Sequence, residues 1–169
     1  KKRINEKTRA IFIEALSNPE GVIADLEAFG KIADDAGIPL VVDNTVATPW
    51  LCQPFRYGAS IVTHSTTKYM VGHGNAMGGA VVDGGTFPWK KHAARFPFLA
   101  GPTPSYNGLV FADAFPKAPL AVYNHAVGLR DLGLNQQPMS AYLTLIGIED
   151  MPLRMQKHSE NALAVAQFL

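Results

Sequence analysis

"PLVVDNTVATPWLCQPFRYGASIVTHSTTKY" (residues 39–69) is the stretch that decides the predicted fold. It contains two short apolar runs, PLVVD at 39–43 and SIVTH at 60–64, which are typical of strands buried on both faces of a parallel sheet. Residues 44–59 separate the two runs and are long enough for the crossover that joins parallel strands. The stretch therefore predicts two parallel strands of one sheet.

The sequence on either side continues the alternation of strands and helices. The apolar segment 10–15 predicts a strand, and residues 24–36 predict a helix because their apolar side chains recur with a period of about 3.6. Residues 78–83 (GGAVVD) predict a further strand. Other helical patterns lie at 51–57, 117–132, 138–148 and 151–169. This order predicts an α/β fold with a mainly parallel sheet and flanking helices.

The composition excludes several classes of protein. The 169 residues suffice for one domain, and a formal net charge of +1 gives no basic surface of the kind that binds nucleic acid. A single cysteine excludes an intrachain disulfide, and neither it nor the histidines have the spacing of metal ligands. No apolar stretch approaches the roughly 20 residues of a membrane helix. We therefore expect a cytoplasmic protein with a small-molecule partner.

Polar side chains follow the ends of the two strands predicted within 39–69. Asp43 ends the first strand, and Ser65, Thr67 and Lys68 follow the second. The carboxyl ends of parallel strands form the crevice in which ligands bind. Pyridoxal phosphate needs an amine for its aldehyde, an anion that keeps its ring nitrogen protonated, and donors for its phosphate. These four residues supply all three, although an ordinary surface lysine is the alternative interpretation of Lys68.

The glycines after Lys68 give no nucleotide-binding motif. They occupy positions 72, 74, 78 and 79, which do not match G-x-G-x-x-G, and they precede a predicted strand instead of opening a helix. They also lack the G-K-[ST] ending of an ATP-binding loop. We expect them to allow close backbone packing near a cofactor.

Four stretches resemble a known family. They are EALSNPEG (14–21), VVDNTVATPWLCQPFRYGASIVTHSTTKYMVGHG (41–74), GLVFADAF (108–115) and LRMQKHSENALAVAQFL (153–169). Together they resemble the Cys/Met-metabolism pyridoxal-phosphate enzymes, and within that family the sulfhydrylase branch. The resemblance implies part of a type I, aspartate aminotransferase-like large domain for residues 1–150. It implies the start of a helix that connects to a C-terminal domain for residues 151–169.

The resemblance also implies a role for each site residue. Lys68 would be the catalytic residue and the Schiff-base lysine, Asp43 the partner of the pyridinium nitrogen, and Ser65 and Thr67 the residues that hold the phosphate. Thr45 would pack against one face of the ring; alternatively it only shapes the turn.

One further position comes from the first of the four stretches. Asn18 would approach the hydroxyl side of the ring. Alternatively it is only the first residue of an Asx turn.

The activity implied by the resemblance is γ-replacement on O-acetylhomoserine. Sulfide or methanethiol would give homocysteine or methionine, with acetate as the second product. A cystathionine γ-synthase or methionine γ-lyase activity of the same family is the alternative, because the cofactor residues are shared. The resemblance further implies a homotetramer and a family chain more than twice this length, so we expect the isolated 169 residues to be inactive.

Overall fold

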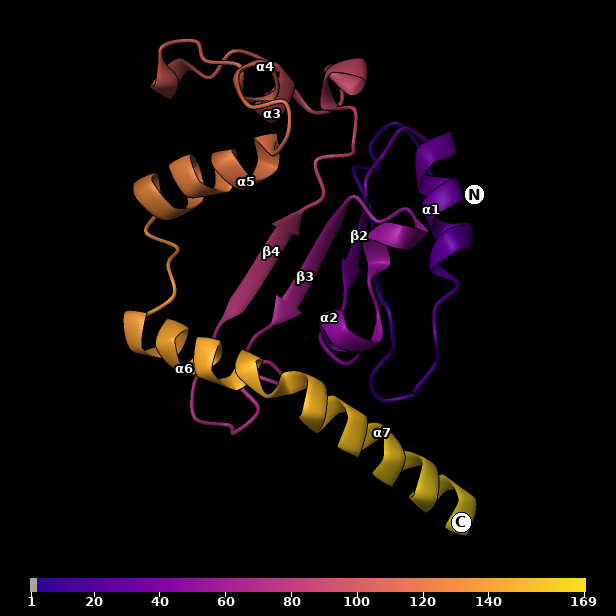
Figure 1. The fold of residues 1–169 in the computed structure, drawn as a ribbon. Coiled ribbons are helices and arrows are strands. Elements are labelled where there is room, and N and C mark those ends of the chain that lie inside the picture. Colours follow the sequence, from indigo (N-terminus) through magenta and orange to yellow (C-terminus); the bar gives the residue numbers. More distant parts are fainter. Residues whose placement is uncertain (1–2) are drawn as a thin grey trace.

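A four-stranded sheet flanked by helices organises residues 3–169, the part of the chain that the structure, a computed structural model, describes (Figure 1). Residues 1 and 2 of the predicted large domain lie outside the described residues. The strands are β1 (Ile11–Glu14), β2 (Leu40–Asp43), β3 (Ile61–Ser65) and β4 (Gly79–Asp83), in the spatial order β1-β2-β3-β4. The first three run parallel and β4 is antiparallel to β3. The predicted α/β fold with a mainly parallel sheet is confirmed.

The crossover from β1 to β2 contains the helix predicted at 24–36, observed as α1 (Leu26–Asp35). The Asp25 carboxylate accepts a hydrogen bond from the Ala28 nitrogen at 3.0 Å and so caps the first turn. Gly37 follows the helix with a φ of +62°, a left-handed conformation that favours glycine. The cap and the glycine therefore fix the two ends of α1.

The crossover from β2 to β3 contains two short helices where the sequence predicts one at 51–57. They are α2 (Thr48–Leu51) and the 3-10 helix η1 (Pro54–Tyr57). Pro54 explains the break, because proline disfavours helical backbone in the residue before it.

The chain after β4 is helical and forms a second group of elements. These are η2 (Trp89–His92), α3 (Pro97–Ala100), η3 (Pro104–Tyr106), α4 (Phe111–Ala114), α5 (Pro119–Tyr123), the π-helix η4 (Asn124–Asp131), α6 (Pro138–Glu149) and α7 (Met151–Phe168). The helices predicted at 138–148 and 151–169 are confirmed. The pattern at 117–132 is divided between α5 and η4. No helix among residues 3–169 combines the length and the apolar character needed to cross a membrane.

The hydrophobic core lies around β2 and β3, the two central strands. Leu40 and Val42 of β2 and Ile61 of β3 are buried, and Leu99 and Phe111 from the second half of the chain pack into the same cluster. Residues of the second group thus pack against the central strands, and the carboxyl ends of β1, β2 and β3 lie together at one edge.

Candidate functional site

One cavity of about 670 Å³ opens at the carboxyl ends of the parallel strands. It is lined by all six residues that the sequence singles out: Asn18, Asp43, Thr45, Ser65, Thr67 and Lys68. Its other lining residues are Glu14, Leu16, Val46, Tyr69, Gly72, Gly74 and His158. Glu14, Asp43 and Ser65 are the last residues of β1, β2 and β3. The topology of the sheet therefore gathers the six residues.

Asp43 is positioned by the sheet and by the turn that follows it. It pairs in register with Glu14 on β1 and with Thr63 on β3. Paired residues on neighbouring strands project to the same face of a sheet. The Asp43 Oδ1 atom accepts a hydrogen bond from the Thr45 nitrogen at 2.9 Å. The carboxylate is therefore held at the end of β2, on the face where the cavity opens.

Thr45 links the end of β2 to the end of β3. Its Oγ1 atom accepts a hydrogen bond from the Ser65 nitrogen at 2.8 Å, and its own nitrogen donates to Asp43. The interpretation that Thr45 shapes the turn after β2 thus matches its contacts. The same contacts place it between the carboxylate and the serine.

Lys68 lies in the loop 66–78 between β3 and β4, which we call the lysine loop. The Lys68 nitrogen donates to the Ser65 carbonyl at 3.3 Å, and the Lys68 carbonyl accepts from the Gly72 nitrogen at 2.8 Å. Gly72 has a φ of +78°, which glycine adopts most readily. Lys68 itself is exposed while lining the cavity, so its amine is accessible to a ligand there.

Thr67 closes the lysine loop through its side chain. Its Oγ1 atom accepts a hydrogen bond from the Gly78 nitrogen at 3.1 Å and donates to the Gly78 carbonyl at 3.3 Å. A hydroxyl has a single proton to donate. To donate to a phosphate oxygen, Thr67 therefore has to release the Gly78 carbonyl.

Glu14 is a site residue that the sequence analysis did not select. Its Oε2 atom accepts a hydrogen bond from the Asn18 nitrogen at 2.8 Å, which fixes the turn carrying Asn18 beside the cavity. The bond uses the backbone of Asn18, and the Asn18–Pro19 peptide bond is cis. A carboxylate near the end of the strand predicted at 10–15 was the available signal.

His64 lies behind the site on the opposite face of β3 from Ser65. The side chain is buried, and its Nδ1 atom has no hydrogen-bond partner among the described residues. Burial lowers the pKa of His64 below its ordinary value, while the charge of Asp43 and a backbone hydrogen bond at Asn44 act in the opposite direction. A neutral imidazole therefore underlies the strand end at neutral pH.

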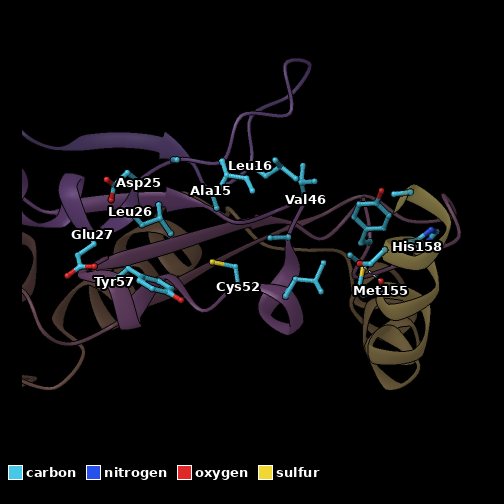
Figure 2. Close-up of a pocket in the computed structure, with 17 residues that line it drawn as sticks. Ala15, Leu16, Asp25, Leu26, Glu27, Val46, Cys52, Tyr57, Met155 and His158 are labelled. Atoms are coloured by element: carbon cyan, nitrogen blue, oxygen red, sulfur yellow. Dashed lines mark hydrogen bonds between the residues drawn. The ribbon is translucent and has the colours of Figure 1, made fainter. Parts of the chain in front are cut away.

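A second cavity of about 620 Å³ adjoins the first and is mostly apolar (Figure 2). The two cavities share Leu16, Val46, Tyr69 and His158. Figure 2 shows Met155 and His158 of α7 at one end of this cavity and Leu26 and Tyr57 at the other, with Cys52 between them. Burial raises the pKa of the Cys52 thiol, which favours a neutral, packing side chain.

The donor set of the first cavity fits pyridoxal phosphate. The cavity combines an amine from Lys68, a carboxylate from Asp43 and hydroxyls from Ser65 and Thr67. These groups match an aldehyde, a pyridinium nitrogen and a phosphate.

Comparisons with known proteins agree with this chemistry. The family model described as Cys/Met metabolism PLP-dependent enzyme matches residues 1–169. The O-acetyl-L-homoserine sulfhydrylase of Leptospira meyeri is 45% identical over 177 residues, which cover 100% of this chain and 40% of that protein. The homocysteine/cysteine synthase of Saccharomyces cerevisiae is 42% identical over 169 residues, which cover 99% of this chain and 38% of that protein.

A solved structure has the same fold. It comes from Campylobacter jejuni, is described as an O-acetylhomoserine (thiol)-lyase, and contains N'-pyridoxyl-lysine-5'-monophosphate. The TM-score is 0.88 with 41% sequence identity, and the match covers 99% of this chain and 41% of that one. The chain thus spans about two fifths of the length of the proteins that it matches.

Proposed function

Because the chain belongs to the Cys/Met-metabolism PLP-dependent enzymes, we propose that it forms the cofactor site of an O-acetylhomoserine sulfhydrylase. The reaction replaces the γ-acetoxy group of O-acetylhomoserine with sulfide or methanethiol, giving homocysteine or methionine and acetate. The names of the relatives, which include O-acetyl-L-homoserine sulfhydrylase and homocysteine/cysteine synthase, support this substrate class. The main structural support is the cavity in which Lys68, Asp43 and Ser65 meet.

Each residue of the cavity has a proposed task. When bound, pyridoxal phosphate supplies an electron sink that makes the α-proton of an amino acid acidic. Asp43 keeps the ring nitrogen protonated, because an adjacent negative charge favours the protonated form. Ser65 and Thr67 would hold the phosphate, Thr45 would pack against the ring, and Asn18 would face its hydroxyl side.

Lys68 has two proposed tasks. Its amine would hold the cofactor through the aldehyde, and the free amine would be the base that moves protons at the α- and β-carbons of the substrate. Acetate leaves from the γ-carbon, and sulfide then adds at that carbon. A base must be able to lose its own proton, which a lysine amine can do and an arginine guanidinium cannot.

The surface of the described residues supports assembly with further polypeptide. α6 and α7 expose many large apolar side chains, among them Met139, Tyr142, Leu145, Leu153 and Leu163. We propose that residues 151–169 begin the helix connecting to a C-terminal domain, and that the assembled enzyme is a cytoplasmic homotetramer, as the resemblance implies.

The test compares Lys68→Ala and Lys68→Arg with the wild-type residue in the full-length protein. Borohydride should fix the cofactor onto Lys68 in the wild type, which mass spectrometry of the 66–78 peptide detects. Both variants should lose this adduct, with turnover reduced roughly 100- to 10,000-fold. A Lys68→Ala enzyme with full turnover would contradict the proposal.

A substrate comparison tests the reaction itself. The wild-type protein is supplied with O-acetylhomoserine plus sulfide, with O-succinylhomoserine plus cysteine, or with methionine alone. Homocysteine from the first pair supports the sulfhydrylase. Preference for the second pair or for methionine would instead identify a cystathionine-forming enzyme or a lyase.

A further inference from the structure

The junction of α6 and α7 packs directly against the backbone of the lysine loop. Figure 1 shows α6 beside the end of the sheet at which β3 stops. Gly147, near the end of α6, lies so close to the carbonyl oxygens of Met70 and Val71 that a Cβ atom there would collide with both. This contact joins main chain to main chain, and its closeness depends on the absence of a side chain at Gly147.

Arg154 of α7 connects the two segments by hydrogen bonds. Its Nη1 donates to the Tyr69 carbonyl at 2.8 Å, its Nη2 donates to the Gly147 carbonyl, and its Nε donates to Asp150 Oδ1 at 2.8 Å. A side chain at Gly72 would collide with the same guanidinium. The Arg154 side chain is only 18% exposed. One guanidinium therefore ties the residue after Lys68 to the end of α6.

Apolar and aromatic contacts extend along α7. Met151 and Met155 are buried with Met70 in a small cluster against which Tyr69 packs. The rings of Tyr69 and His158 have centroids 5.1 Å apart. Three successive turns of α7 thus contact the lysine loop immediately after Lys68.

We infer that Arg154 is a positioning residue for Lys68, acting through the Tyr69 carbonyl and the packed backbone of residues 69–72. The inference rests on the proposed function, in which the Lys68 amine must reach both cofactor and substrate. A displacement of about 1 Å in a reacting group can lower a rate about 100-fold. The planar fork of arginine donates in three directions here, which the single ammonium group of lysine cannot reproduce.

The experiment uses the full-length protein with Arg154→Gln, Arg154→Lys and, as the matched control, Asp150→Asn. The control removes the charged partner of Arg154 but leaves both carbonyl acceptors. Amide hydrogen exchange is measured first without cofactor. Both Arg154 variants should lose protection at residues 69–72 while β2 and β3 keep theirs, and the control should resemble the wild type.

Kinetics with the cofactor supply the second measurement. We expect kcat of both Arg154 variants to fall about 100-fold while KM changes little, because the base is displaced and the substrate contacts remain. Borohydride should still fix the cofactor onto Lys68 in these variants. Unchanged exchange at 69–72, an equal loss of protection throughout the sheet, or an unchanged kcat would each overturn the inference.

A variant at a second position tests the same contact without changing Arg154, in case the Arg154 variants fail to fold. Gly147→Ala leaves Arg154 intact but forces α6 away from the Met70 and Val71 carbonyls, so it should produce the same localised loss of protection. Unaltered protection at 69–72 in this variant would also contradict the inference. Failure of the proposed function looks different, because it removes the borohydride adduct from the wild type and leaves the exchange results unaffected.

Discussion

The hydroxyl oxygen of Thr45 accepts a hydrogen bond from the backbone nitrogen of Ser65 at 2.8 Å, across the ends of two neighbouring strands. The backbone nitrogen of Thr45 in turn donates to the Asp43 carboxylate at 2.9 Å. The proposed partner of the ring nitrogen and a proposed phosphate ligand are thereby connected through a single residue. A change at Thr45 should affect both.

Thr45→Ala should destabilise the chain and weaken cofactor binding, because it leaves the Ser65 amide without its acceptor. An unsatisfied, partly buried donor costs about 1–3 kcal/mol, which urea unfolding monitored by circular dichroism can measure. Thr45→Ser keeps the oxygen and should restore most of the loss. Equal effects of serine and alanine would show that the methyl group, and not the hydrogen bond, matters.

Asp43→Asn should weaken cofactor binding without unfolding the protein. The change preserves shape but removes the charge that we propose faces the ring nitrogen, and a hydrogen bond to a charged group contributes about 1.5–3 kcal/mol. The dissociation constant should therefore rise roughly 10- to 100-fold in a fluorescence titration with pyridoxal phosphate. Asp34→Asn, an exposed position on α1, is the control and should leave the constant unchanged.

Glu14→Ala should loosen the turn that carries Asn18, since the Asn18 amide loses the carboxylate that accepts its hydrogen bond. Amide exchange followed by NMR should show faster exchange at Asn18, with the amides of β2 unaffected. Glu14→Gln retains an acceptor oxygen and should preserve most of the protection. If alanine leaves Asn18 protected, the turn has another source of rigidity.

His64 should make the fold less stable in mild acid. Burial lowers its pKa in the folded chain below the ordinary value of 6.5. The unfolded chain therefore binds a proton that the folded chain does not, and stability falls as the pH decreases from 6.5 toward the lowered folded value. Urea unfolding between about pH 7.5 and about pH 5.5 should show this decline. In His64→Gln the free energy of unfolding should fall less steeply with decreasing pH. An equally steep fall in this variant would show that other titrating groups cause the decline.

The sheet and most of the site could be predicted from short-range sequence patterns. No residue of β2 or β3 is exposed, which agrees with their apolar sequences. Asp43 and Ser65 end these strands, and parallel strands end at the same edge, which brings the two residues to one cavity. The resemblance added Thr45 and Asn18, which line the same cavity but have no distinctive local pattern.

Other features depend on contacts between distant segments. The apolar pattern of β4 did not show whether this strand runs parallel or antiparallel to β3. The connection at 66–78 shows no helical periodicity, and its length is compatible with either direction. Arg154 donates a hydrogen bond to the Tyr69 carbonyl, 85 residues earlier. Every residue has a backbone carbonyl, so the sequence does not indicate which one accepts. The glycines after Lys68 were expected to pack near a cofactor, and Gly72 and Gly74 do line the first cavity. The sequence did not indicate that Gly72 also packs against the Arg154 guanidinium and Gly78 against the Gln136 side chain.

The bare backbone of Gly147 against the Met70 and Val71 carbonyls has a consequence for protein engineering. A graft that transfers only the residues around Lys68 to another scaffold would omit the junction of α6 and α7, which packs against their backbone. The transplantable unit is a pair of segments far apart in the gene, and recombination between relatives should preserve function only when both come from the same parent.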